Sequence, residues 1–459
     1  MEVKKKCAVC IGCGRCGEYP EDLQVITNSF LKSELLSVDS TDKGSFVIVD
    51  IGTTTIAMEA YNKQGKKLAD YVQPNPQRIF GRDVISRIQA AERPLVAKQM
   101  QGLVKQVLLQ GLEEFRKKVP DIRKVYVAGN TTMLYLLLGY DTTELGYAPF
   151  IASYLETAEI ELGEWTVHVL PGLSAFVGSD IVAGIFASGM AGNSSISLLI
   201  DLGTNGEIVF GNRDFMMSCA CSAGPAFEGG DISCGMRATD GAIEACTIDA
   251  ATMEPNLTIV GEAGQKPVGI CGSGIIDIIS ELFRCGIINA RGQFSREGER
   301  VKRDQHGMGR YVLATAQSSE TGREISINEV DIDNFIRAKG AIFSAIDTLL
   351  SAVDMTVDCI DTVYVAGGIG SGINMKNSVN IGMLPDVELS KFRYIGNSSL
   401  TGAYAMVMSD EANAKCAELG ANMTYLELST HPGYMDNFVA ACFLPHTDSR
   451  LFPNSKQEV

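Results

Sequence analysis

Residues 46–55 read FVIVDIGTTT, and residues 198–206 read LLIDLGTNG. Each stretch is an apolar, β-branched run that ends in Asp-x-Gly-Thr, which is typical of a buried strand leading into a tight polar turn. A second pair of similar stretches follows in the same order, one in each half of the chain. Residues 125–130 read VYVAGN, and residues 363–368 read VYVAGG. Two matched pairs in register indicate an internal duplication. We therefore predict an α/β chain with two similar lobes, and ligands of such chains bind in the cleft between the halves.

The rest of the chain supplies the helices and the domain limits. Apolar residues at helical spacing predict helices over residues 83–91, 96–118, 180–189, 274–285 and 333–353. The stretch 290–321 is polar and irregular, and it predicts loops or a small insertion. We expect a Cys-rich module at 1–20, a short helix and linker at 21–44, a first lobe at 45–192 and a second lobe at 193–459.

Composition restricts the class of protein. The chain has 459 residues, of which 46% are hydrophobic and 20% charged, so we expect a folded chain with two or three domains. A net charge of −16 argues against a nucleic-acid partner, which would require a basic surface. A membrane span needs about 20 consecutive apolar residues, and the sequence has no such run and no signal-peptide pattern at its start. These features predict a cytoplasmic protein.

The two Asp-Gly turns suit phosphate groups. Backbone N–H groups of such a turn, with the hydroxyls beside them, form a concave site for phosphate oxygens. Asp50 and Asp201, at the strand ends, are candidate carboxylates for a magnesium ion that binds through water. A plain hairpin with a polar turn is the alternative. The candidate binding residues of the two turns are Gly52, Thr53, Thr54, Thr55, Gly203, Thr204, Asn205 and Gly206.

A third glycine turn follows the strand at residues 363–366. Gly367, Gly368 and Gly370 leave room for the base or ribose of a nucleotide to lie against the backbone. The turn lies late in the second half, whereas a Rossmann fingerprint follows the first strand of its domain. A P-loop motif is absent from the sequence.

These three elements resemble the signature of the acetate/sugar kinase, heat-shock chaperone and actin superfamily. The resemblance implies a duplicated actin-like (ribonuclease H-like) two-lobed ATPase fold, in which the Asp-Gly hairpins are phosphate loops and the glycine turn is the adenosine loop. The segment 180–189 stands where that family has its interlobe helix, whose first acidic or amide residue positions the attacking water. Asp180 is therefore a candidate for positioning or deprotonating water. A helix N-cap is the alternative role.

Several segments resemble a narrower family, the ATP-dependent reductive activators of corrinoid enzymes. They read NPQR at 75–78, GRDVISR at 81–87, LGYAPF at 145–150, GPAFEG at 224–229, ICGSG at 270–274 and FLPHTD at 443–448. The resemblance implies that ATP hydrolysis drives the reduction of a cob(II)amide cofactor to cob(I)amide. It also implies a corrinoid protein of a methyltransferase system as partner, an electron donor of ferredoxin or flavodoxin type, and a homodimer.

The N-terminus departs from that family, which begins with a plant-type 2Fe–2S domain. Here four cysteines, Cys7, Cys10, Cys13 and Cys16, follow one another at two-residue gaps. The run resembles that of bacterial ferredoxins, and it predicts a 4Fe–4S cluster. The gap before the fourth cysteine is shorter than in those ferredoxins, which leaves the role of Cys16 open. A zinc site and a reactive thiol tail are the alternatives.

The remaining predictions concern four further cysteines and two alternative functions. Cys219, Cys221, Cys234 and Cys246 fit buried small residues, with a second metal or redox site as the alternative. An activator of a 2-hydroxyacyl-CoA dehydratase would bridge a cluster between subunits, with Cys234 and Cys271 as the conceivable ligands. A small-molecule kinase with a structural zinc hook is the other alternative.

Overall fold

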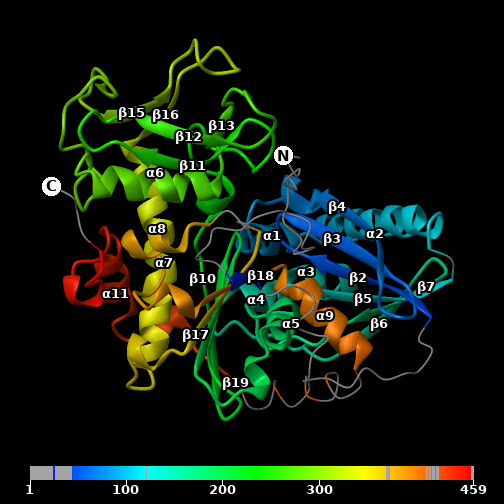
Figure 1. Ribbon diagram of the computed structural model, residues 1–459. Helices are drawn as coiled ribbons and strands as arrows, with labels where there is room; N and C mark the ends of the chain where they lie inside the picture. Colours follow the sequence, from blue (N-terminus) through cyan, green and yellow to red (C-terminus); the bar gives the residue numbers. More distant parts are fainter. Residues whose placement is uncertain are drawn as a thin grey trace.

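The computed structural model describes residues 24–25, 44–119, 121–368, 373–409, 412, 415, 419 and 423–455. Two lobes built around β-sheets lie side by side, and a smaller subdomain projects from the second lobe (Figure 1). The cysteine module, the linker and Gly370 lie outside the described residues, apart from residues 24–25 and 44. None of the described helices combines the length and apolar character that a membrane span requires.

The first lobe is a six-stranded mixed sheet in the order β4-β3-β2-β5-β7-β6. The central strand β2 and the second half of β5 are mostly buried, which explains their apolar sequences. The strands are β2 (Ser45–Ile51), β3 (Thr55–Tyr61), β4 (Lys67–Pro74), β5 (Ile122–Gly129), β6 (Ala158–Leu162) and β7 (Trp165–Val169). The helical elements are η2 (Pro76–Ile79), α1 (Val84–Ala91), α2 (Pro94–Arg116), α3 (Thr131–Leu138), α4 (Thr143–Gly146) and α5 (Ser179–Ser188).

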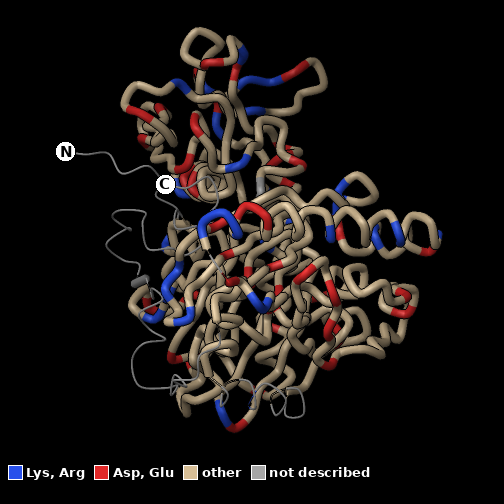
Figure 2. Tube along the Cα trace, turned by 90° about the vertical axis from the view of Figure 1, so that its right-hand side faces the viewer, with Lys and Arg blue, Asp and Glu red and all other residues tan. Residues whose placement is uncertain are grey.

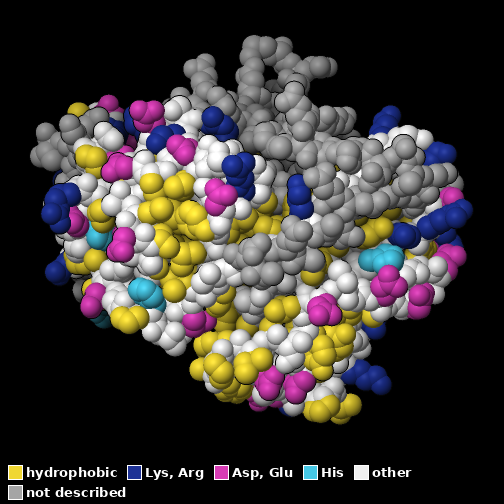
Figure 3. Space-filling view, turned by 90° about the horizontal axis from the view of Figure 1, so that it is seen from below, with side chains coloured by type: hydrophobic (Ala, Val, Ile, Leu, Met, Phe, Trp, Pro, Cys, Tyr) yellow, Lys and Arg dark blue, Asp and Glu magenta, His cyan; other side chains and the backbone are white. Residues whose placement is uncertain are grey.

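The second lobe contains a seven-stranded sheet in the order β1-β18-β17-β8-β9-β10-β19. Its strands are β1 (Gln24–Val25), β8 (Ser197–Leu202), β9 (Gly206–Gly211), β10 (Met216–Cys221), β17 (Thr362–Ala366), β18 (Phe392–Gly396) and β19 (Met423–Tyr425). Its α-helices include α7 (Glu329–Ser351), α8 (Met375–Asn380), α9 (Ser398–Met408) and α11 (Tyr434–Ala441). Seen from below, apolar side chains gather on the left of the view, which is the side of this lobe (Figure 3).

Strand pairing confirms the duplication. In each lobe an antiparallel hairpin, β2–β3 or β8–β9, lies beside a parallel strand, β5 or β17. Asp50 faces Ala128 in the first lobe, and Asp201 faces Ala366 in the second. The two Asp-Gly sequences therefore occupy equivalent positions, and the expected two-lobed α/β fold is confirmed.

The small subdomain corrects one expectation. Residues 290–321 were expected to be loops or an insertion, yet they contain β14 (Val301–Arg303) and β15 (Gly309–Ala314), which form an antiparallel sheet with β16 (Ile325–Asn328). Polar residues alternate with buried ones in β16, and Glu324 just before it forms ion pairs with Lys302 of β14 and Arg310 of β15, so the composition resembles that of a loop. A second sheet is made of β11 (Ala242–Ile248), β12 (Pro255–Ile259) and β13 (Gly269–Ile270), with α6 (Gly272–Arg284) packed on β11.

Another expectation concerns the segment 21–44, which was expected to be a short helix and linker. Gln24–Val25 instead forms strand β1, which pairs in parallel with β18 at the edge of the second sheet. The expected helices are present at 84–91, 94–116, 179–188, 272–284 and 329–351.

Helices α5 and α9 join the two lobes. They pack closely on each other, and one hydrophobic cluster includes side chains from both sheets and both helices. A Cβ atom on Gly402 of α9 would lie 1.7 Å from the carbonyl oxygen of Ala183 in α5, so glycine is required for this helix contact. Figure 2, turned by 90°, shows the small subdomain standing above this joined body, with acidic and basic residues interspersed along the described chain.

Candidate active site

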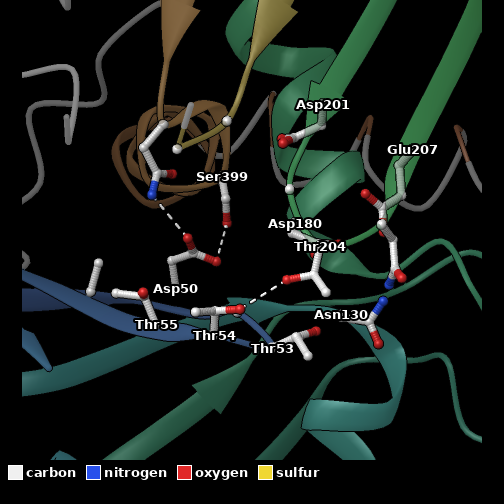
Figure 4. A pocket seen from close by; sticks show the side chains of 17 residues that line it. Asp50, Thr53, Thr54, Thr55, Asn130, Asp180, Asp201, Thr204, Glu207 and Ser399 are labelled. Carbon is white, nitrogen blue, oxygen red and sulfur yellow. Dashed lines mark hydrogen bonds between the residues drawn. The ribbon is translucent and has the colours of Figure 1, made fainter. Parts of the chain in front are cut away.

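A cavity of about 170 Å³ lies between the two Asp-Gly turns (Figure 4). It brings together most of the candidate residues, which come from both lobes and from the N-terminus of α5. The candidates that line it are Asp50, Gly52, Thr53, Thr54, Thr55, Asp180, Asp201, Gly203, Thr204, Asn205, Gly367 and Gly368. Gly206 is not among the lining residues. It begins β9, and a Cβ atom there would lie 2.8 Å from the sulfur of Cys221, so its small size serves packing.

The two turns meet across the cavity. The hydroxyl oxygens of Thr54 and Thr204 lie 2.8 Å apart, although the residues belong to different lobes. This contact places hydroxyl groups of both turns in one cavity, as a shared phosphate site would need.

The carbonyl groups of the first turn accept hydrogen bonds from two buried residues, Asn75 and Arg87. Asn75 donates from Nδ2 to the carbonyl oxygen of Gly52 at 2.9 Å, and its backbone N–H donates to that of Thr54 at 2.8 Å. Arg87 of α1 donates from Nη2 to the carbonyl oxygen of Thr53 at 2.6 Å. Three successive carbonyl groups are thus occupied on the lobe side, which restricts how the peptide planes of the turn can rotate.

Arg87 is completely buried without a carboxylate partner among the residues that bind it. Its Nε donates to the carbonyl oxygen of Gly81, and Nη1 lies 3.0 Å from the sulfur of Met133. Burial lowers the pKa of Arg87 to about 10, so the guanidinium stays charged at neutral pH. The segments 75–78 and 81–87 were noted in the sequence for their resemblance, but no role was assigned to either side chain.

The N-terminus of α9 contacts both strand-end aspartates, and the sequence did not indicate this. Asn397 Nδ2 donates to Asp50 at 2.9 Å, and Ser399 Oγ donates to its other oxygen at 3.0 Å. Ser398 Oγ donates to Asp201 at 3.2 Å. The available signal was an Asn-Ser-Ser start before an apolar helix, which predicts a cap but no contact with residues some 350 positions away.

Four carboxyl groups line this cavity, and their negative charges repel one another. Burial first, and then Asp50 and Asp201, raise the pKa of Asp180 to about 8. Burial and Asp50 raise the pKa of Asp201 to about 6, and burial raises that of Asp50 against its hydrogen bonds from Asn397 and Ser399. Asp180 also accepts a hydrogen bond from the N–H of Ile181 within its own helix.

Glu207 is the fourth carboxyl group and was missed in the sequence. It lies on β9 directly opposite Asp201, a place that Ala57 occupies in the first lobe. Burial, followed by Asp180 and Asp201, holds its pKa well above the usual range. An acidic residue just after the second turn was the available signal.

The residues fit a magnesium-bound phosphate chain, the group that the fold family implies. Within the described chain, no three Asp, Glu, His or Cys side chains come close enough to hold a metal ion directly. Magnesium commonly keeps several waters and binds one or two carboxylates together with substrate phosphates, which suits this arrangement. A divalent cation would also offset the repulsion among the four carboxyl groups.

The cysteines divide into described and undescribed groups. Cys7, Cys10, Cys13 and Cys16 lie outside the described residues, as does Gly370. Cys219, Cys221 and Cys246 are buried, as expected for small core residues, whereas the same expectation is wrong for Cys234, which is only half-buried. Cys271 is 2% exposed, and its thiol contacts the carbonyl oxygen of Ile243, so it does not present the surface thiol that a cluster between subunits needs.

Comparison with known proteins agrees with this geometry. The model for the RACo middle region matches residues 46–193, and the model described as the C-terminal domain of RACo, the ASKHA domain, matches residues 195–456. The chain is similar to the corrinoid activation enzyme RamQ of Eubacterium limosum, with 31% identity over 91% of this chain and 74% of that protein.

Two further relatives extend the comparison. A [Co(II) methylated amine-specific corrinoid protein] reductase of Methanosarcina barkeri is 24% identical, over 66% of this chain and 59% of that protein. A solved structure of a reductive activator for corrinoid, iron–sulfur protein superposes with a TM-score of 0.81 at 40% identity, covering 90% of this chain and 68% of that one. The chain therefore belongs to the RACo family and carries that family's middle region followed by its C-terminal ASKHA domain.

Proposed function

We propose that this protein is an ATP-dependent reductive activator of a corrinoid protein. It hydrolyses ATP between the lobes and couples that reaction to the one-electron reduction of cob(II)amide to cob(I)amide. The observation that carries the proposal is the meeting of two equivalent Asp-Gly turns around Asp180. The names of the two curated relatives, an activation enzyme and a reductase for corrinoid proteins, support the second half.

The described residues divide the work at the nucleotide. The turns at Gly52–Thr55 and at Gly203–Asn205 would bind the phosphates, and Gly367 and Gly368 would contact the adenosine, with Gly370, outside the described residues, as a further predicted contact. Asp50 and Asp201 would hold the magnesium ion, which would offset the charge of the phosphates. Asp180 would orient the attacking water and accept its proton after the magnesium–nucleotide has displaced the proton that Asp180 holds in the ligand-free cleft.

The electron path begins in the N-terminal module. Cys7, Cys10, Cys13 and Cys16 would hold a 4Fe–4S cluster, which supplies one-electron transfer at low potential. A ferredoxin or flavodoxin type of donor delivers one electron for each electron passed to cobalt. The corrinoid protein belongs to a methyltransferase system, which uses the reduced cobalt as a nucleophile.

The test uses the full chain, purified and reconstituted without oxygen. We expect about four irons per chain, a 4Fe–4S signal in electron paramagnetic resonance after reduction, and cob(I)amide formation only with ATP present. Asp201→Asn should abolish ATP-dependent reduction and leave the iron content unchanged, while Asp121→Asn, at an exposed site, serves as the control. A colourless reconstituted protein, or reduction that proceeds equally without ATP, would contradict the proposal. Transfer of radiolabelled phosphate from ATP to a small molecule would indicate a kinase instead.

A further inference from the structure

Exposed apolar side chains concentrate on one part of the first lobe. The described chain has eleven large apolar residues with high exposure, and six of them fall within residues 79–95 and 147–154. Such concentration is typical of an interaction site, whereas single exposed apolar residues are ordinary. The six are Ile79, Ile85, Leu95, Tyr147, Ile151 and Tyr154.

The two segments form one surface. Ile88 of α1 packs against Gly146 at the end of α4, and both segments contribute to one small hydrophobic cluster that includes Val84 and Leu145. The hydroxyl of Tyr147 donates to Glu92 just beyond the end of α1, at 2.7 Å. Helix α1 has only eight residues, so its length is about 12 Å. A single partner protein can therefore cover the helix together with the residues at its two ends. We call this area, residues 78–95 with 147–154, the α1 surface.

The α1 surface carries three exposed arginines. Arg78, Arg82 and Arg93 are exposed, and their side chains have no ion pair or hydrogen bond with the described residues. The neighbouring carboxylates, in contrast, are already engaged by local donors. Asp83 caps α1 through Ser86 N–H, and Glu92 accepts from Tyr147. The positive groups are therefore the ones left available to a partner.

We propose that the α1 surface is the docking site of a protein partner that presents an apolar area flanked by carboxylates. On the proposed function, on which this inference rests, that partner is the corrinoid protein. Arginine and tyrosine are enriched in protein interfaces, and a central apolar area with a charged rim is their usual composition. A second copy of this chain is the competing occupant, and the sedimentation measurement below distinguishes the two.

The α1 surface lies on a helix that also contacts the first phosphate turn. Helix α1 carries Ile85 on its outer side and Arg87 on its inner side, and Arg87 binds the carbonyl oxygen of Thr53 in the first phosphate turn. A partner held against α1 therefore contacts the element that supports this turn. We expect the partner to stimulate ATP hydrolysis through this contact.

The experiment compares two surface variants with two matched controls in the full, reconstituted protein. Ile85→Glu and Arg82→Glu alter the α1 surface, and an acidic residue in the first turn of α1 is compatible with the helix. Met308→Glu, at 39% exposure against 41% for Ile85, and Arg213→Glu make the same changes elsewhere. The readouts are basal ATPase activity, and the KM and kcat of corrinoid reduction with the purified corrinoid protein.

We expect both α1 variants to raise KM for the corrinoid protein by about tenfold or more, with basal ATPase activity within about twofold of the wild type. The controls should match the wild type. An unchanged KM in Ile85→Glu and Arg82→Glu, while the wild type reduces the corrinoid, would overturn the docking site alone. Failure of the wild type to reduce the corrinoid would overturn the proposed function. Loss of a dimer in the α1 variants, measured by sedimentation, would assign the surface to a second copy and would also overturn the docking site.

Discussion

Replacing Asp180 by Asn tests the electrostatics of the cleft. Asp180 lies between two other carboxylates, and its pKa is raised to about 8, so about 90% of this side chain is protonated at pH 7 without ligand. A magnesium ion near Asp50 and Asp201 would stabilise the carboxylate form of Asp180. We therefore expect magnesium–nucleotide binding to expel that proton. Asp201, with a pKa of about 6, is only about 10% protonated at pH 7 and would contribute little, and Glu207, whose pKa burial raises first, is present in both the wild type and Asp180→Asn.

The expected size of the effect follows from these fractions. Wild-type protein should release about 0.9 proton more than Asp180→Asn when it binds a non-hydrolysable magnesium–ATP analogue at pH 7. The difference should fall to about 0.1 proton at pH 9, where Asp180 is already ionised. Protons from the nucleotide itself cancel, because the same ligand is used throughout.

The assay is isothermal titration calorimetry in buffers with different ionisation enthalpies. Asp121→Asn provides the control, because Asp121 is exposed, pairs with Arg123 and has a left-handed backbone conformation that asparagine tolerates. Its proton release should equal that of the wild type. Equal release by the wild type and Asp180→Asn at pH 7 would refute the reasoning.

The same group should also influence stability. The unfolded pKa is near 3.8 and the folded pKa about 8, so the folded state holds the extra proton between these values. Ligand-free protein should therefore lose stability as pH rises from about 4 to about 8, by at most about 1.4 kcal/mol per pH unit. Denaturant titrations of Asp180→Asn should show a shallower pH dependence, and solvent access to the cleft will make the measured difference smaller than this limit.

Three further predictions concern residues that support the site and the fold. A lysine at position 87 cannot form both contacts of Arg87, with Gly81 and Thr53. Arg87→Lys should therefore weaken nucleotide binding about tenfold, measured by calorimetry, and lower the free energy of unfolding by about 1–3 kcal/mol, measured by denaturation. Unchanged affinity would contradict a positioning role for Arg87. Gly402→Ala forces α5 and α9 apart and should lower the free energy of unfolding by about 3 kcal/mol or more. Gly102→Ala, where no atom lies near the added methyl group, should leave the free energy of unfolding equal or raise it by up to about 1 kcal/mol. Similar denaturation midpoints for the two variants would refute the packing argument. Lys339 is fully buried and donates to the carbonyl oxygens of Phe443 and Pro445, so Lys339→Met should cost about 1–3 kcal/mol. Burial lowers the pKa of Lys339 to about 7, so its contribution to the free energy of unfolding should rise with pH from about 7 to 10.5. An identical pH dependence of stability in the wild type and in Lys339→Met would contradict this prediction.

Local patterns predicted the elements of the site well. The strand that ends at Asp50, its repeat at Asp201 and the helix that begins near Asp180 all follow from a few neighbouring residues each, and the fold brings them into one cavity. The polar strands at 301–328 were harder to predict, because ion pairs and short length make them resemble loops. The cysteine module and Gly370 lie outside the described residues and stay predictions.

The sequence by itself determined the duplicated hairpins, and so the two lobes and the cleft between them, because burial of β-branched runs and the turn chemistry of Asp-Gly-Thr are local properties. Only the tertiary structure decided which side chains complete the cleft. Asn397 meets Asp50 across 347 positions of sequence, and Arg87 reaches the turn at Thr53 from a helix on the same lobe. Such contacts depend on how helices and sheets pack to bury their apolar faces, and no residue pattern within a single segment specifies that packing.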